Sequence, residues 1–251
     1  MIELTLDPGS VARTIELLCR RVEERFPGSG LGRVCRELHR VAGQTRERAV
    51  WIARPIVSLR IAVAGLIALI FGGLGGTVVS LRTPKAPLEA FQFIQLLEAG
   101  INDVVWVGAG IFFLITLETR IKRRRALAAI RELRAIAHLV DMHQLTKDPE
   151  WVLGRGQESG LLPPRRMTRF ELSRYLDYCS EALSLTGKIA SLYIQNFDDD
   201  VALAGVNEVE NLTTGLSRKI WQKLMILYAM GPEPGAPSEQ GAGPVAKSTG
   251  R

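Results

Sequence analysis

The sequence predicts an all-α membrane protein, with a two-span transmembrane hairpin attached to a cytoplasmic helical bundle that has a coiled-coil-like seam. Two apolar runs can cross a bilayer, positive charge flanks the pair of runs, and the other segments show helical three-and-four spacing. No segment shows a convincing strand pattern. The predicted parts are an N-terminal helical hairpin (1–55), a first span (56–81), an external loop (82–99), a second span (100–119), a cytoplasmic bundle (120–230) and a disordered tail (231–251).

The first span contains no charged residue from Ile61 to Leu81, and a helix of that length reaches about 30 Å, the thickness of bilayer hydrocarbon. Its glycines do not form a phosphate-binding loop, because no Lys follows Gly76. Small residues instead recur at every fourth position, which is typical of helices that pack closely in lipid. The alternative is that small residues are simply common in such helices. The predicted packing stripe is Ala64, Ala68, Gly72, Gly76 and Ser80.

The second span reaches sufficient length only if it includes Asn102 and Asp103. We expect these polar residues at the headgroup boundary, and the alternative is an ion path or pore mouth. In an antiparallel hairpin, Arg60 at the start of the first span and Glu118 at the end of the second would reach the same membrane face. The sequence therefore predicts that these two residues form an ion pair.

Positive charge predicts the orientation of the hairpin, because cytoplasmic flanks are enriched in Lys and Arg. The connection between the spans has few positive residues, so both termini should be cytoplasmic. The formal net charge of +6 is then explained by topology and lipid contact, and we expect no nucleic-acid partner. An excess of arginine over lysine, with many Ala and Gly, indicates a GC-rich bacterium and its inner membrane. The flanking residues are Arg46, Arg48, Arg54, Arg60, Arg120, Lys122, Arg123, Arg124 and Arg125.

Capping signals mark the remaining helices. A first helix should begin after Asp7 and end at FPGSG, and a second should run from Arg33 to Pro55. The second span should continue as an unbroken helix until Pro149 stops it. A capping box of Thr168 and Glu171 opens the next helix, and the triad Asp198, Asp199 and Asp200 should cap the last one. On that last helix we expect Asn207 and Asn211 on or near the seam, where they would fix the register or line a binding site.

Few residues suggest chemistry. His138, Asp141 and His143 are weak candidates for a metal site, disfavoured because a spacing of five residues turns the two His away from each other. The three cysteines have no metal or redox spacing and should be reduced. No nucleophile motif stands in a usable context, so the sequence predicts no cofactor and no enzyme.

The first functional hypothesis is a self-associating membrane-anchored scaffold or signalling component, with the lipid bilayer, further copies of the chain and a cytoplasmic protein as partners. A second is an oligomeric ion channel or pore-forming effector in which Asn102 and Asp103 ring the outer mouth. A third, a membrane-bound metal enzyme, would require His138, Asp141 and His143 to converge with groups on other helices.

Overall fold

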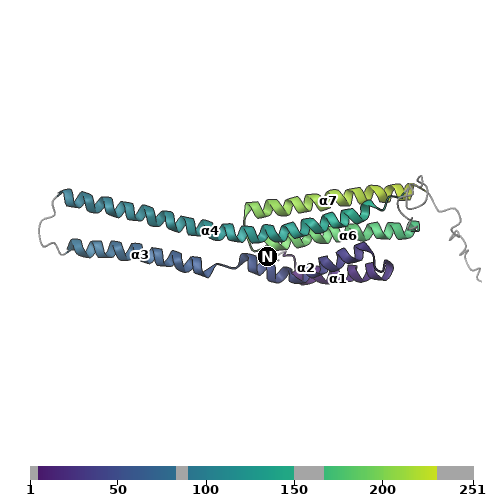
Figure 1. Ribbon diagram of the computed structural model, residues 1–251, viewed down its shortest axis with the longest axis horizontal. Helices are drawn as coiled ribbons and strands as arrows, with labels where there is room; N and C mark the ends of the chain where they lie inside the picture. The colour runs from purple at the N-terminus through teal and green to yellow at the C-terminus, as the bar shows by residue number, and fades with distance from the viewer. Residues whose placement is uncertain (1–4, 83–89, 150–166, 231–251) are drawn as a thin grey trace, which may run out of the picture.

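The computed structural model describes residues 5–82, 90–149 and 167–230, and within these ranges the chain is helical between short turns, with no strand. The elongated molecule has a two-helix hairpin at one end and a helical bundle at the other (Figure 1). The predicted tail, 231–251, and part of the predicted loop lie outside the described residues. The helices are α1 (Pro8–Arg25), α2 (Gly30–Ala53), α3 (Val57–Arg82), α4 (Ala90–Leu145), α6 (Arg169–Ile194) and α7 (Asp200–Ala229).

The turn between α1 and α2 is closed by local backbone chemistry. Gly28 has φ of +67°, a left-handed conformation in which a side chain would be strained. The hydroxyl of Ser29 accepts a hydrogen bond of 3.0 Å from the N–H of Gly32 and so caps α2. This cap moves the start of α2 to Gly30, three residues before the predicted start at Arg33.

Helix α4 belongs to both halves of the molecule. Its 56 residues run without interruption from Ala90 to Leu145, a length of about 84 Å at ~1.5 Å per residue. The prediction of a helix that continues unbroken past the second apolar run is therefore confirmed, although α4 ends at Leu145, four residues before the predicted stop at Pro149. The predicted loop over 82–99 was wrong in its second half, because α4 is already helical ten residues before Gly100. The sequence there has no helix-breaking residue after Pro87.

Helix α6 is the central helix of the bundle, since it buries 14 of its 26 residues and packs against α1, α2, α4 and α7. The predicted capping box opens it: the hydroxyl of Thr168 accepts from the N–H of Glu171, whose carboxylate accepts from the N–H of Thr168 at 2.8 Å. One edge of its core is aromatic, with Phe26 against Tyr175 in an edge-to-face arrangement at 5.2 Å between ring centroids.

The predicted aspartate cap of the last helix is confirmed for Asp199. Its carboxylate accepts from the N–H of Ala202 at 2.9 Å and lies 2.8 Å from the guanidinium of Arg123. The placement of Asn207 and Asn211 was wrong, because both side chains are exposed. The buried residues of α7 are mainly aliphatic and lie on the side of the helix that faces the bundle: Val206, Val209, Thr213, Leu216, Ile220, Leu224 and Leu227.

Candidate functional site

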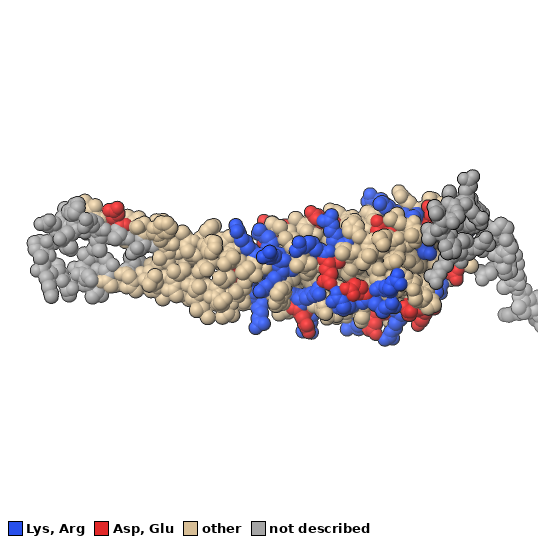
Figure 2. Space-filling model, viewed as in Figure 1, with Lys and Arg blue, Asp and Glu red and all other residues tan. Residues whose placement is uncertain are grey.

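The hairpin of α3 and α4 presents apolar side chains that the protein itself does not cover. The most apolar 18-residue windows in these two regions have mean hydropathies of 2.2 and 1.7, and no residue of either window is buried. Phe71, Trp106 and Phe112 are each 70% exposed or more. Figure 2 shows this end of the molecule almost free of charged residues, in contrast with the bundle. By length and composition, both helices are able to cross a membrane.

The two helices of the hairpin meet along one narrow seam. Between Val57 and Gly73 the half-buried residues of α3 recur at the spacing of a single helix face: Leu59, Val63, Leu66 and Ile70. On α4 the opposite position is a glycine, since a Cβ placed on Gly110 would lie 3.6 Å from Cδ1 of Leu66. The seam therefore uses only one side of α3.

The small-residue stripe lies on the other side of α3. At about 100° per residue, Ala68 is about 200° around the helix from Leu66, and Ala64 and Gly72 lie beside it. Ala64, Ala68, Gly72 and Gly76 are all exposed, and a Cβ on either glycine would have no described atom within 4 Å. Ser80 is helical, and its side chain lies outside the described residues. The described part of the stripe, from Ala64 to Gly76, is therefore exposed and takes no part in the seam with α4.

Asn102 and Asp103, the polar residues of the predicted second span, lie inside α4 and not at its end. Asn102 and Asp103 are helical, with more than three turns of α4 between them and Ala90. The amide of Asn102 is exposed, and the side chain of Asp103 lies outside the described residues.

A carboxylate lies where the hairpin joins the bundle. Glu118 Oε1 is 2.8 Å from Nζ of Lys122, one turn along α4, and 3.8 Å from Nη2 of Arg60 on α3. The structure therefore brings the predicted partners Arg60 and Glu118 together, with Lys122 as the nearer cation. Arg60 is 63% exposed and Glu118 is 16% exposed, so the guanidinium lies at the surface above the carboxylate.

The flanking arginines divide into two groups. Some hold the bundle together: Arg48 forms an ion pair with Glu132, Arg123 with Asp199, and Arg125 stacks on Trp51 at 4.2 Å from the ring centroid. Sequence reasoning missed these roles, because the partners lie 74 or more residues away along the chain. The other five are exposed: Arg46 lies within α2, and the four nearest the apolar hairpin, which we call the basic collar, are Arg54, Arg60, Arg120 and Arg124.

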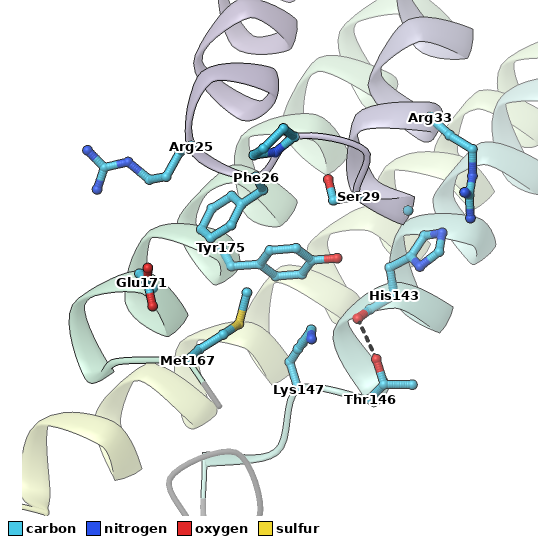
Figure 3. Close-up of a pocket in the computed structure, with 12 residues that line it drawn as sticks. Arg25, Phe26, Ser29, Arg33, His143, Thr146, Lys147, Met167, Glu171 and Tyr175 are labelled. Atoms are coloured by element: carbon cyan, nitrogen blue, oxygen red, sulfur yellow. Dashed lines mark hydrogen bonds between the residues drawn. The ribbon is translucent and has the colours of Figure 1, made fainter. Parts of the chain in front are cut away.

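The three weak metal candidates are separated by the structure. His138 is exposed, and Asp141 accepts a hydrogen bond of 2.6 Å from the amide of Gln144. His143 lies in a cavity at the far end of the bundle (Figure 3). Across the part of the chain that the structure describes, no group of three or more His, Cys, Asp or Glu is close enough to hold a metal ion.

The fold and these surfaces define an all-helical chain with two helices able to span a membrane. No family model matches it, and no curated protein or solved structure is significantly similar to it. Its function is therefore argued from its own geometry.

Proposed function

We propose that this protein is a bacterial inner-membrane protein that associates with itself through α3 and serves as a membrane-anchored scaffold or signalling component, with both termini in the cytoplasm. The observation that supports it best is the exposed small-residue stripe on the apolar hairpin. In lipid a second helix gains little from hydrophobic burial, so close backbone approach along small residues is what favours association.

Three further features agree with membrane insertion. Large apolar side chains such as Phe71 and Phe112 are costly in water and favourable in hydrocarbon. The basic collar stands at the level of anionic headgroups, and Trp51 beside it is 51% exposed, as expected of an interfacial aromatic residue. The bundle continues from the hairpin at the collar end, where cytoplasmic positive charge is expected.

The number of chains in the assembly is measured first, by light scattering on the detergent-solubilised full-length protein with bound detergent subtracted. A dimer or higher oligomer is expected. A strict monomer at all protein concentrations contradicts self-association. Four or more chains make a central pore geometrically feasible, and the channel hypothesis is then tested by ion flux into liposomes, comparing the wild type with Asp103→Asn.

The stripe itself is tested by Gly72→Leu. The monomer should tolerate this change because no described atom lies within 4 Å of the new Cβ, whereas a second helix would be pushed away. We expect the oligomer to dissociate at concentrations where the wild type is assembled. The matched control is Gly108→Leu on α4, which is exposed and equally open but lies off the stripe. An equal effect of both changes would show that the stripe is not the contact.

Orientation is tested with reporter fusions at the C-terminus in bacterial cells. We expect activity from a reporter that folds only in the cytoplasm and none from alkaline phosphatase, which needs the periplasm. The reverse pattern would place the bundle outside and overturn the orientation read from the positive charges.

A further inference from the structure

A cavity of about 370 Å³ lies at the end of the bundle farthest from the hairpin. Its walls are the turn between α1 and α2, the end of α4 and the beginning of α6 (Figure 3). This volume falls within the range of small-molecule sites, roughly 300–1,000 Å³. At ~1.5 Å per residue, His143 is about 36 Å along α4 from Thr119, so the cavity is far from any bilayer around the hairpin.

Positive charge dominates the walls of the cavity. Arg25, Arg33 and Lys147 line it, against one carboxylate, that of Glu171. Glu171 is already engaged, because its Oε2 accepts hydrogen bonds from the N–H and the hydroxyl of Thr168 at 2.8 and 3.1 Å. Neither Arg25 nor Arg33 forms an ion pair with another described residue. Among the described residues of the walls, the charges of Arg25 and Arg33 are therefore not matched by a carboxylate.

His143 stands between two of these cations. Burial, and then the charges of Arg33 and Lys147, lower the pKa of His143 below its ordinary value. The imidazole is therefore neutral at pH 7 and offers one N–H donor. Gly30 lies directly against the ring, where a Cβ would collide with it. Because α2 begins at Gly30, the positive end of its dipole adds to the field in the cavity.

The remaining wall can hold an uncharged group. The rings of Phe26 and Tyr175 are buried beside the cavity, and Figure 3 shows the hydroxyl end of Tyr175 directed toward the side where His143 lies. Aromatic faces with a few convergent polar groups are the usual lining of sites for small organic molecules. The cavity thus combines an anion-binding side with an aromatic side.

We propose that this cavity binds a small soluble molecule that carries a phosphate group. A phosphate matches the site better than a single carboxylate, because it carries close to two negative charges at pH 7 and can accept both N–H donors of the forked Arg33 guanidinium. This cavity is separate from the small-residue stripe of α3 through which the protein is proposed to associate with itself. Binding of the phosphate compound in the cavity therefore does not depend on self-association.

The test uses full-length protein in detergent micelles and radiolabelled inorganic pyrophosphate in equilibrium dialysis at constant ionic strength. We expect saturable binding that is about tenfold weaker in Arg33→Gln, the loss typical of one charged hydrogen bond. The matched control is Arg46→Gln on the same helix, an exposed arginine near the other end of α2, which should bind as the wild type does. Absence of saturable binding, or equal affinity in Arg33→Gln, overturns the proposal.

Nuclear magnetic resonance of ring-labelled histidine locates the binding. The chain has three histidines, so His39 and His138 are internal references. Pyrophosphate should shift the His143 signals alone and raise the pKa of His143, because the bound anion offsets Arg33 and Lys147. Equal shifts of all three signals would indicate nonspecific association with the basic surface and would overturn the assignment.

Discussion

Removal of the Asp199 carboxylate should loosen the junction between the hairpin and the bundle. This side chain is 3% exposed and does two things at once. It caps α7 through the N–H of Ala202, and it receives hydrogen bonds from Nε and Nη2 of Arg123, which stands just after the apolar part of α4. Two substitutions separate the two roles, since asparagine retains a capping oxygen and removes the charge, whereas alanine removes both.

The expected loss of stability follows from the loss of the N-cap of α7. Loss of an N-cap costs about 1 kcal/mol, and for a chain of this size 1 kcal/mol lowers Tm by about 2–4 °C. Asp199→Ala should therefore melt about 2–4 °C below Asp199→Asn, and both should melt below the wild type. The control is Asp198→Ala, an exposed neighbouring carboxylate with no hydrogen bond to another described residue, which should change stability by less than about 0.5 kcal/mol.

The assay is thermal unfolding in detergent, followed by far-UV circular dichroism. Equal melting of Asp199→Ala and Asp199→Asn would refute the cap, and equal destabilisation by Asp198→Ala would refute the special position of Asp199. Burial by itself raises the pKa of Asp199, but the hydrogen bonds from Arg123 and Ala202 outweigh it and hold the pKa below 3.8. Its stabilisation is thus complete above about pH 4 and is lost as the pH falls through the lowered pKa, a loss that Asp199→Asn should lack.

Two further predictions concern side chains in the bundle. Cys35 and Cys179 are fully buried, whereas Cys19 is half-buried. Mass spectrometry after brief maleimide treatment should therefore find one adduct on the folded protein and three adducts after unfolding. Rapid labelling of all three cysteines in the folded protein would contradict their burial in the core. Gly30→Ala should push the His143 ring toward the cavity, shift its resonances and weaken pyrophosphate binding, whereas Gly43→Ala, with open space at its Cβ, should do neither.

The helix starts were the part of the fold most accessible from sequence. An Asp, Ser or Thr cap acts on N–H groups two or three residues away, so its signal lies within a few consecutive residues. The beginnings at Asp7, Thr168 and Asp199 were read in this way and are confirmed. The start at Ser29 carried the same signal and was missed. The long α4 was predictable because its periodicity continues unbroken through the stretch that ends at Leu145.

Contacts between segments that lie far apart along the chain could not be predicted from the sequence. Arg123 and Arg124 are adjacent in sequence, yet one pairs with Asp199 and the other lies exposed on the collar, a difference decided by which side of α4 meets the turn before α7. The cavity also escaped prediction, because helix ends from three separate regions build it. His143 was singled out from sequence as a metal candidate, and only the neighbouring Arg33 shows that its surroundings suit an anion.

The two connections between hairpin and bundle differ in stiffness. Helix α2 ends at Ala53 because Pro55 has no N–H and disfavours a helical conformation at Arg54, so α3 starts as a separate helix. Helix α4 has no such break, and its hydrogen-bond ladder passes from the apolar segment into the bundle. A tilt of α3 can be absorbed at Pro55, whereas a rotation or shift of α4 must move the Arg123 guanidinium against Asp199 and the start of α7. Mechanical coupling between the apolar hairpin and the bundle therefore runs through α4.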